Sequence, residues 1–442
     1  MAILDNTEKY VVGIGEALID CFPDGTRRLG GAPLIFAYHA GKTCGNAVIV
    51  SAIGDDDNGS IIRKGVKKLD VSVDYLFTKE NIDSGTVEVN DSNPNDPQYN
   101  IKTNSAWSFI KEDYEGQLDA LAKKTAAVYF GVLASFCGYT SRDTIDKFLD
   151  AVPDDCWRVF DVNLRHNPIE NGKYTRALYT EELVKQYIAK CNVLKVNKEE
   201  LEYVCGICGI NSDLSNKKKA ETIMTLHQKV KILMLTLGEE GSYVFWRSDE
   251  SSKINSQVYG LSVEEPLAVG AGDALAGAFI GEILKKEVGS IDYAHAHREA
   301  VKRAAKVCEA KNSMPPIMKS DIFVSYSRQD ENIVIQFCKL FNAKKITVWR
   351  DKEKILYGER FDKKIQEAIR NCKVVVFFSS NFANDSVFVE QEITYANQKN
   401  KTIVTIRLDD SEFNNQIESF LDYKNSWDLN MLYSTINKKK SE

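Results

Sequence analysis

RVFDVNL, at residues 158–164, lies between AAVYFGVL at 126–133 and NVLKVN at 192–197, and a helical pattern follows each of these apolar runs. Strands that alternate with helices at this spacing predict a mostly parallel sheet with helices on both faces. Nearer the N-terminus, residues 10–20 (YVVGIGEALID) are expected to form another buried strand that ends in a glycine turn and an aspartate. The first part of the chain is therefore predicted to be an α/β domain.

Two short strands are expected to project from this sheet. Residues 86–89 and 99–101 lie on either side of an Asn, Pro and Asp cluster at 91–97. A turn cluster between short alternating runs predicts a hairpin or flap. We therefore predict a small β lid over about residues 84–104.

A second α/β pattern begins after Met314-Pro315-Pro316-Ile317-Met318. Its predicted strands are DIFVSYS (321–327), ITVWRD (346–351), VVVFFSS (374–380) and TIVTIRL (402–408). Roughly 120 residues suffice for one compact flavodoxin-like domain. The predicted organisation is a first domain at 1–315, a linker at 316–319 and a second domain at 320–442.

The composition is that of a soluble globular protein, with 43% hydrophobic and 27% charged residues. The net charge of −6 argues against a general nucleic-acid binder. The sequence shows neither a leader pattern nor a run of about 18 apolar residues, so we expect a cytoplasmic protein without membrane contact. The ten cysteines lack paired metal-ligand spacing, although Cys205 and Cys208 form a C-x-x-C, and reduced thiols are expected.

Gly270-Ala271-Gly272-Asp273 precedes a predicted helix that is rich in small residues. A helix N-terminus presents free backbone N–H groups, and its dipole favours an anion such as phosphate. Glycine lets a phosphate approach without a Cβ clash. Asp273 is placed to accept a proton from a substrate hydroxyl that attacks a γ-phosphate. On its own the tetrapeptide also fits an ordinary helix-entry turn.

Together with its companion motifs, this tetrapeptide makes residues 10–315 resemble the ribokinase/PfkB family of carbohydrate and nucleoside kinases, particularly its fructokinase-like branch. The motifs occur in family order: GEALID (15–20), GGAP (30–33), AW (106–107), FDVNLR (160–165), NKEE (197–200), TLGEEG (236–241) and GAGD (270–273). The resemblance implies a ribokinase-like fold, an ATP site that uses Mg²⁺, and a lid that often also forms a dimer interface.

The resemblance also implies roles for individual residues. Asp20, Gly30 and Gly31 would line the substrate pocket, and Arg165 would approach the transferring phosphate. Asn197 and Glu200 would organise Mg²⁺-bound water, with no metal ion assigned to direct protein ligands. The nucleotide site and anion hole would be lined by Thr236, Gly238, Gly270, Ala271 and Gly272, with Asp273 as the base.

Two positions depart from the family's pattern. Ile35 stands where the family commonly has an asparagine that bonds a substrate hydroxyl, and an apolar chain there changes or abolishes sugar recognition. Leu267-Ala268 replaces an Asp-Thr pair that usually helps to place a monovalent cation beside the anion hole. Two interpretations stay open: a working small-molecule kinase, and a ligand-binding sensor derived from one.

Residues 320–430 resemble TIR domains, particularly the bacterial ones. The motifs are DIFVSYS (321–327), VWRD (348–351), a loop at 352–361, SSN (379–381) and SVFVEQEI (386–393). In family members that cleave NAD⁺, a glutamate on the helix after the fourth-strand loop is essential, and the motif spacing places it at Glu392. Glu390 competes with it, but the two lie on different faces of a helix, so only one can point into the cleft.

A single carboxylate suits NAD⁺ cleavage, because nicotinamide is already a cationic leaving group that needs no general acid. Glu392 would hydrogen-bond the ribose hydroxyls and stabilise the developing oxocarbenium charge. The predicted NAD-binding residues are Tyr326, Arg328, Trp349 and Phe388, of which Trp349 and Phe388 would stack on the nicotinamide ring. Ordinary core packing is the alternative for Trp349.

The leading hypothesis is a TIR-domain NAD⁺ hydrolase effector of bacterial antiphage defence, with the PfkB-like domain as a sensor of a nucleotide or sugar ligand. Self-association is expected through the TIR domain and through the kinase lid. One alternative is an active ATP-dependent carbohydrate or nucleoside kinase that carries the TIR domain as a protein-interaction adaptor. The other is a bifunctional kinase and NADase.

Overall fold

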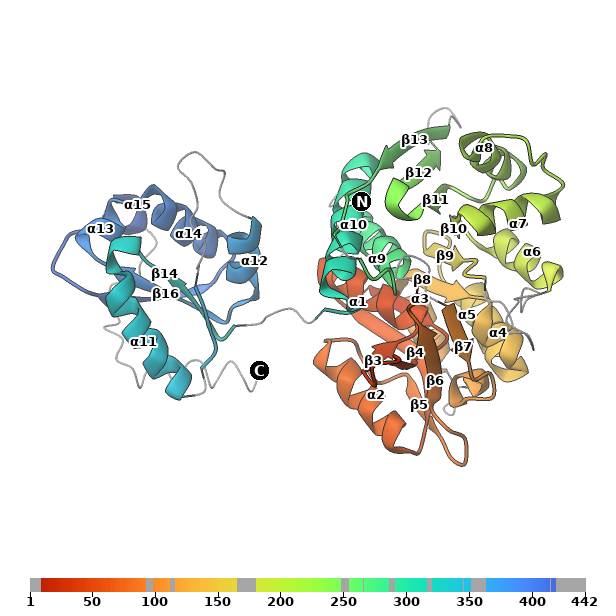
Figure 1. Cartoon of the computed structure of the whole chain (residues 1–442), viewed down its shortest axis with the longest axis horizontal. Coiled ribbons are helices and arrows are strands. Elements are labelled where there is room, and N and C mark those ends of the chain that lie inside the picture. Colours follow the sequence, from red (N-terminus) through yellow and green to blue (C-terminus); the bar gives the residue numbers. More distant parts are fainter. Residues whose placement is uncertain are drawn as a thin grey trace. The chain divides into compact units, whose positions relative to one another are not determined.

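The computed structural model of the chain divides into two compact units, Met1–Pro315 and Pro316–Glu442. It describes residues 9–92, 98–111, 116–164, 180–247, 254–264, 266–285, 291–315, 320–344, 346–350, 363–413 and 415–418. The predicted linker at 316–319 lies outside these residues. Figure 1 shows the elements of both units.

The first unit contains two sheets and the helices that cover them. Its strands are β1 (Tyr10–Ile14), β2 (Leu18–Cys21), β3 (Arg27–Gly30), β4 (Ala47–Gly54), β5 (Leu76–Lys79), β6 (Gly85–Asn90), β7 (Gln98–Ile101), β8 (Thr125–Gly131), β9 (Trp157–Asp161), β10 (Val193–Asn197), β11 (Ile232–Thr236), β12 (Ser242–Arg247) and β13 (Ile254–Tyr259). Its α-helices are α1 (Ala32–Cys44), α2 (Asp57–Lys68), α3 (Gln117–Lys123), α4 (Leu133–Cys137), α5 (Tyr139–Ala151), α6 (Glu181–Lys190), α7 (Lys198–Cys208), α8 (Asn216–Leu226), α9 (Ala271–Leu284) and α10 (Tyr293–Ala310).

The main sheet has the strand order β13-β12-β11-β10-β9-β8-β1-β4-β5. The neighbours from β5 to β11 pair in parallel, and β12 and β13 add an antiparallel edge. Every residue of β4 is buried, as expected for a strand that is covered on both faces. The predicted ribokinase-like α/β fold is thus confirmed for this unit.

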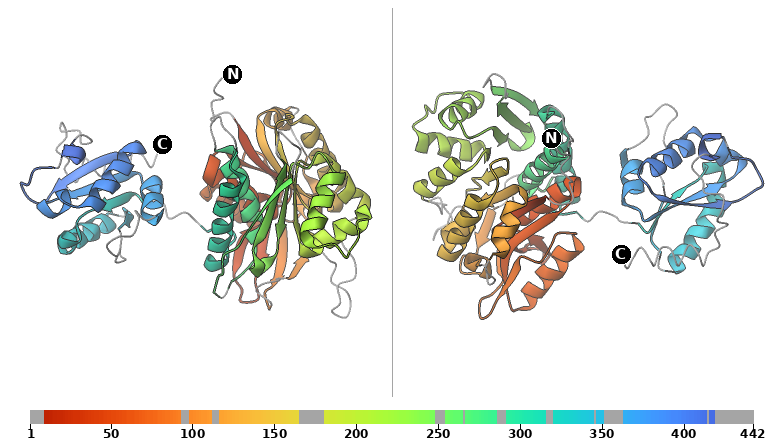
Figure 2. Two further views of the ribbon diagram at one scale, coloured as in Figure 1. Left: turned by 90° about the horizontal axis from the view of Figure 1, so that it is seen from above. Right: turned by 180° about the vertical axis from the view of Figure 1, so that it is seen from behind.

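Helices cover both faces of the main sheet, as the two views of Figure 2 show. One apolar cluster joins the sheet to α1, α9 and α10 through residues such as Phe36, Phe279 and Ala300. A second cluster joins the opposite face to α5, α6 and α7 through residues such as Ile145 and Leu201. The carboxyl ends of the parallel strands therefore open between two helical layers, where α/β proteins commonly bind ligands.

The lid is larger than the predicted hairpin. It is a four-stranded sheet in the order β3-β2-β6-β7, in which β6 and β7 form the expected antiparallel pair. The predicted buried strand is β1, which ends before the expected glycine turn at Gly15, where φ is 144°. The chain then continues into a separate strand, β2, which contains Asp20. Leu18 and Val87 of this lid pack on Leu267 and Val269 in one apolar cluster.

The second unit is a smaller α/β domain. Its four parallel strands, in the order β15-β14-β16-β17, are β14 (Ile322–Ser325), β15 (Val348–Trp349), β16 (Val374–Ser379) and β17 (Thr402–Arg407). Its helices are α11 (Glu331–Ala343), α12 (Lys363–Asn371), α13 (Asn381–Asn384), α14 (Val387–Gln398) and α15 (Asn415–Glu418). Apolar clusters lie on both faces of the sheet, as in a flavodoxin-like arrangement.

Candidate active sites

The predicted anion hole lies at the N-terminus of α9, a helix packed between α1 and α10. Gly270 is its N-cap and has a φ of 73°, a left-handed conformation that glycine adopts without strain. A Cβ built on Gly270 would lie 2.5 Å from Ser313 Cβ and 3.0 Å from Ile35 Cδ1. Glycine is therefore required here both by the backbone and by close packing behind the loop.

Asp273, in the first turn of α9, belongs to a polar network built on three neighbouring strands. The Tyr129 hydroxyl lies 3.0 Å from Asp273 Oδ1 and 2.6 Å from Asp161 Oδ2. Lys195 Nζ donates to the same Asp161 oxygen over 2.6 Å. Strand register explains this convergence, because Asp161 of β9 pairs with Gly131 of β8 and with Lys195 of β10.

The network holds buried charges in defined protonation states. Burial, followed by the charges of Asp161 and Asp273, raises the pKa of Tyr129 well above its usual value, so the phenol stays protonated and can donate. Burial by itself would lower the pKa of Lys195, but the negative charges of Asp161, Asp273 and Glu200 outweigh it and raise that pKa. A built Cβ on Gly272 would lie 3.1 Å from Lys195 Nζ, so this ammonium lies directly beside the anion hole.

Sequence reasoning missed Tyr129, Asp161 and Lys195 as parts of a site. A signal was present, since each is a buried polar residue between two apolar neighbours in the sequence. Parallel neighbours bring such residues together at one end of the sheet. Only the strand order decides which polar residues meet.

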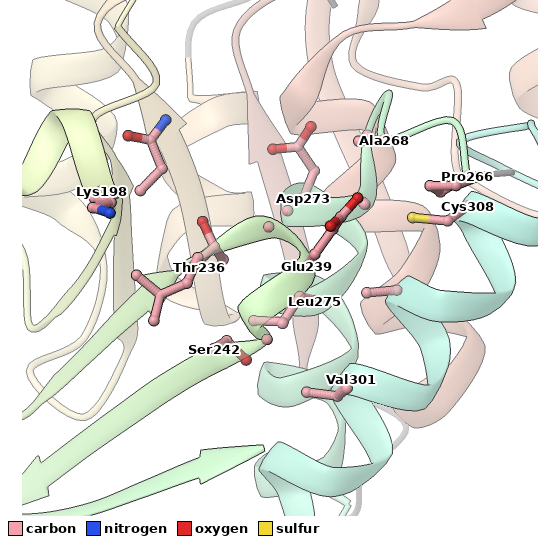
Figure 3. A pocket seen from close by; sticks show the side chains of 18 of the residues that line it. Lys198, Thr236, Glu239, Ser242, Pro266, Ala268, Asp273, Leu275, Val301 and Cys308 are labelled. Atoms are coloured by element: carbon pink, nitrogen blue, oxygen red, sulfur yellow. The ribbon is translucent and has the colours of Figure 1, made fainter. Parts of the chain in front are cut away.

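A pocket of about 910 Å³ opens above this network. Figure 3 shows Thr236, Glu239 and Asp273 around the same hollow. The predicted site residues that line it are Asn197, Glu200, Thr236, Gly238, Gly270, Ala271, Gly272 and Asp273. Gln98 and Tyr99 of strand β7 line it as well, so the predicted lid reaches this pocket.

Three predicted substrate residues lie elsewhere. Asp20, Gly30 and Gly31 belong to the β2–β3 hairpin region and are not among the residues that line this pocket. The Asp20 carboxylate packs directly on Gly30, where a built Cβ would lie 2.3 Å from Asp20 Oδ2. Arg165 lies outside the described residues.

Ile35 does not occupy a substrate contact in this pocket. It is buried in the apolar cluster that contains Leu34, Tyr38 and Met314, directly behind Gly270. The side chain therefore supports the anion hole from the rear.

Asn197 and Glu200 form a reciprocal cap at the start of α7. Asn197 Oδ1 accepts from the Glu200 amide over 2.8 Å, and Glu200 Oε2 accepts from the Asn197 amide over 2.7 Å. Glu200 Oε1 also accepts from the Leu164 amide over 2.9 Å. Burial, together with the nearby charge of Asp161, raises the pKa of Glu200 to about 7, against the opposing effects of Lys195 and the two amides.

This arrangement fits Mg²⁺ that is held through water and nucleotide phosphates. Both Glu200 oxygens are already engaged by backbone amides. Among the described residues, no group of three or more His, Cys, Asp or Glu side chains is arranged to hold a metal ion. Mg²⁺ commonly keeps several waters and binds through substrate phosphates, so a caged site is not required.

Unlike the residues at the Mg²⁺ position, the residues at the expected monovalent-cation position do not fit the ion. Leu267, in place of the family's aspartate, is buried among Leu18, Phe22 and Val87. An apolar side chain in an apolar cluster offers no oxygen ligand, and the residues present at 267–268 do not fit a side-chain cation site.

In the second unit, Glu392 lies at the carboxyl end of strand β14. It belongs to α14, is 8% exposed, and accepts a hydrogen bond of 2.5 Å from Ser325 Oγ, at the last residue of β14. Glu390 is half-buried on a different face of the same helix. The fold thus turns Glu392, rather than Glu390, toward the strand end.

The four predicted NAD-binding residues are placed around this sheet end in different settings. Trp349 stacks on the buried Phe323, with ring centroids 5.0 Å apart, so its ring takes part in core packing. The Tyr326 hydroxyl accepts from Arg350 over 3.3 Å, and Arg328 is exposed in a short 3-10 helix. Phe388 is half-buried in the first turn of α14. The loop at 352–361 lies outside the described residues.

The first unit has the ribokinase-like α/β fold, and the second unit is a TIR domain. The family model for pfkB family carbohydrate kinases matches residues 8–321, and that for TIR domains matches residues 322–434. The chain belongs to the pfkB family of carbohydrate kinases and carries a C-terminal TIR domain.

Curated relatives and solved structures match the first unit. A probable fructokinase-4 of Arabidopsis thaliana is 26% identical over 326 residues, which cover 70% of this chain and 92% of the relative. An ATP-dependent 6-phosphofructokinase of Thermoanaerobacterium thermosaccharolyticum is 22% identical, covering 64% of this chain and 84% of its own length. A fructokinase from Vibrio cholerae, solved with fructose, ADP and potassium ion, superposes with a TM-score of 0.57 at 20% identity, over 70% of this chain and 95% of that one.

Within the described residues, no helix combines the length and the apolar character needed to cross a bilayer.

Proposed function

We propose that the chain is an NAD⁺-cleaving TIR effector whose pfkB unit binds a nucleotide or sugar-type ligand and regulates it. The observation that carries the proposal is the buried Glu392 carboxylate, held by Ser325 at the carboxyl end of β14. A carboxylate at this place can stabilise the oxocarbenium charge that develops as nicotinamide departs. The setting we propose is antiphage defence, with self-association through the TIR unit and the lid.

Nicotinamide release from NAD⁺ by the full chain tests this proposal. Glu392→Gln removes the charge but keeps the shape, and we expect release to fall at least about 100-fold, as when one electrostatic stabiliser is lost. Glu390→Gln is the matched control, because it makes the same change two positions away on another face of α14. A Glu392→Gln protein that releases nicotinamide as fast as the control would contradict the assignment.

An active ATP-dependent sugar or nucleoside kinase is the second candidate. It is favoured by the Tyr129–Asp273 contact and by the shared pocket that the anion hole and Thr236 line. The relatives are named as fructokinases and a phosphofructokinase, which supports a carbohydrate acceptor. ADP formation with a panel of sugars and nucleosides tests it, and Asp273→Asn is expected to abolish any activity found.

The two candidates separate in the same assays. ADP formation that is lost in Asp273→Asn, with no NAD⁺ consumed under any condition, would leave the kinase with a TIR adaptor. Both activities in one preparation would indicate the bifunctional enzyme.

A further inference from the structure

The last residues of the first unit form a strap across the back of the anion hole. The strap is residues 311–315, which leave the end of α10 and cross α1. Lys311 has a φ of 48°, and this left-handed turn ends α10 and redirects the chain. Ser313 and Met314 are only 3% and 4% exposed, so the strap is part of the packed interior.

Side chains from β3 and α1 hold the strap by its carbonyl oxygens. Arg28 donates to the carbonyl of Lys311, and the Tyr38 hydroxyl donates to that of Pro315. His39 Nε2 lies 2.8 Å from the Ser313 carbonyl oxygen, and burial lowers the pKa of His39 to about 3, so the neutral ring donates. Three anchors in five residues fix the path of the strap up to the unit boundary at Pro315.

The strap also touches the phosphate-binding loop directly. The closest approach to a Cβ built on Gly270 is Ser313 Cβ, at 2.5 Å, with Ile35 Cδ1 next at 3.0 Å. The Leu267 amide, three residues before Gly270, donates to the Cys308 carbonyl over 3.3 Å, at the end of α10. The loop that would receive a phosphate is therefore backed by the segment that leads out of the unit.

The family resemblance already implies a nucleotide phosphate site at the anion hole. We propose that the strap transmits the occupancy of this site to the TIR unit, so that a bound nucleoside triphosphate acts as a regulator. This inference rests on the proposed function and names the ligand class and the route of regulation. Close-packed interiors move in concert, so a shift of the Gly270 loop onto a phosphate displaces Ser313 and the anchored strap with it. The ring of Pro315 fixes the φ of the last described residue of the first unit, which limits how much of a displacement is absorbed there.

The ligand class follows from where the contact lies. Ser313 and Ile35 pack behind Gly270, at the positive end of the α9 dipole and beside the Lys195 ammonium. A phosphate is drawn to this point, whereas an uncharged nucleoside gains little there. An effector without phosphate is therefore expected to bind more weakly and to leave the strap undisturbed.

Hydrogen exchange of the full chain tests the strap without reference to catalysis. The probes are the non-hydrolysable β,γ-imido analogue of ATP with Mg²⁺, and adenosine as the phosphate-free control. We expect the analogue to slow exchange in peptides that cover residues 308–315 at least about fivefold, the smallest usual coupling, and adenosine to leave it unchanged. Unchanged exchange while calorimetry shows the analogue bound would overturn the proposal, as would a failure of the analogue to bind.

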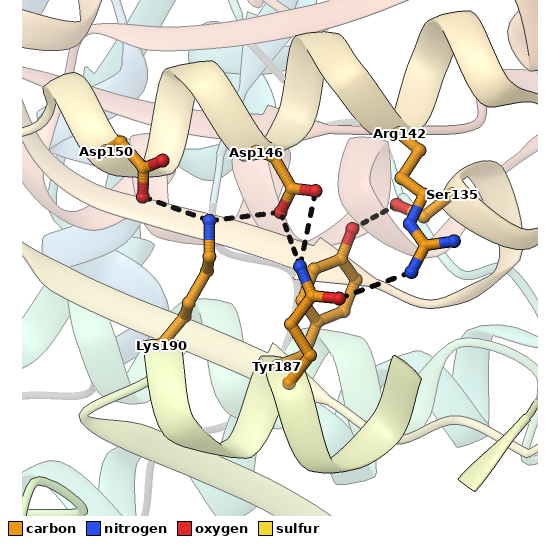
Figure 4. A network of polar contacts seen from close by, with 7 residues as sticks. Ser135, Arg142, Asp146, Asp150, Tyr187 and Lys190 are labelled. Atoms are coloured by element: carbon orange, nitrogen blue, oxygen red, sulfur yellow. Dashed lines mark hydrogen bonds and ion pairs between the residues drawn. The ribbon is translucent and has the colours of Figure 1, made fainter. Parts of the chain in front are cut away.

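A pair of tyrosine variants then tests transmission. Tyr38→Phe removes the hydroxyl that holds Pro315. Tyr187→Phe is the matched control, because it removes the α6 hydroxyl that is paired with Ser135 of α4. This pair belongs to the network of Figure 4, on the opposite face of the main sheet. In the unmodified chain and in Tyr187→Phe, the analogue is expected to change the rate of nicotinamide release at least about fivefold, and in Tyr38→Phe less than about twofold.

The outcomes distinguish this proposal from the proposed function. If the chain releases no nicotinamide but the analogue slows exchange at 308–315, the response of the strap to phosphate stands and the NAD⁺ assignment fails. If nicotinamide release responds to the analogue equally in both tyrosine variants and exchange at 308–315 is unchanged, the NAD⁺ assignment stands and the strap is overturned.

Discussion

Lys195 is a charged residue between apolar neighbours in strand β10. The free-energy cost of burying its charge is offset by one buried partner, Asp161. Its side chain is 8% exposed and that of Asp161 is fully buried, with 2.6 Å between Nζ and Oδ2. Removing one partner of such a pair leaves an uncompensated buried charge. At the residue scale, the candidate kinase site therefore depends on the pairing of buried charges as well as on groups that could bind a ligand.

Lys195→Met is expected to lower the free energy of unfolding by about 3–5 kcal/mol, because Asp161 loses its counter-charge. Urea unfolding of the full chain measures this. Lys219→Met is the matched control, since Lys219 is equally buried but pairs with Glu202, which is 45% exposed. The control substitution is expected to lower the free energy of unfolding by less than about 1 kcal/mol. Equal losses of stability in both variants would show that the buried Asp161 does not cause the effect.

His39 makes stability depend on acid pH. Its pKa is lowered from 6.5 to about 3, first by burial and then by Arg303 and Lys42, against the Ser313 carbonyl. Between these pH values the unfolded chain binds a proton that the folded chain does not, so the unfolding free energy falls as pH falls through this window. At pH 5, His39 lowers the free energy of unfolding by about 2 kcal/mol relative to neutral pH.

Urea unfolding of His39→Gln at pH 7.5 and pH 5 checks this contribution. The variant is expected to lose less stability on acidification than the unmodified chain. If the free energy of unfolding falls by the same amount between pH 7.5 and pH 5 in both proteins, His39 is not the source of the pH dependence. Burial and Arg298 lower the pKa of His297 to about 4, so His297 continues to contribute to the loss of stability at acid pH in both proteins.

At the scale of elements, helix α9 carries the anion hole and is held by close contact with α1. A Cβ on Gly277 would lie 2.5 Å from the Phe36 carbonyl oxygen and 3.0 Å from His39 Cβ. A Cβ on Gly281 would lie 2.7 Å from Thr43 Cβ. These small residues let α9 pass close to α1, which brings Gly270 within reach of Ile35.

Gly277→Ala is therefore expected to destabilise the first unit by about 1–3 kcal/mol through overpacking, and to weaken binding of the ATP analogue. Gly206→Ala in α7 is the matched control, because nothing lies within 4 Å of its built Cβ. Alanine favours a helix interior over glycine, so the control is expected to be neutral or stabilised by up to about 1 kcal/mol. Thermal unfolding and calorimetry measure the two effects.

At the scale of the whole molecule, the chain joins a nucleotide-type pocket to a TIR unit through a segment that belongs to the first unit's interior. Under the proposal above, the strap would make the two proposed activities depend on one backbone path. The proposed self-association makes them depend on concentration as well, since an isologous contact forms only between copies of the chain.

Nicotinamide release per chain is accordingly expected to rise with protein concentration. Dilution through the dissociation range of the oligomer should lower the rate per chain at least about tenfold, because mass action separates the TIR units. Rates at several concentrations, with oligomer size measured on the same samples, check this. A constant rate per chain while the oligomer dissociates would show that each TIR unit is complete by itself.

Much of the fold could be predicted from local pattern. Apolar runs such as NVLKVN at 192–197 predicted buried parallel strands, and the structure confirms β10 there. The tetrapeptide at 270–273 marked a helix N-terminus, because glycines and an acidic first turn are local features. The resemblance to TIR domains selected Glu392 over Glu390, and helical periodicity implied only that the two side chains lie on different faces.

What the sequence by itself determined was the order of elements, the two α/β units and the residues with the chemistry for a phosphate and a carboxylate site. The tertiary structure alone decided which distant residues meet. Strand order joined Tyr129, Asp161 and Lys195 beneath Asp273, and the return of the chain after α10 set Ser313 behind Gly270. Helical and strand patterns repeat over a few residues, whereas these contacts join segments tens to hundreds of positions apart, and packing alone selects them.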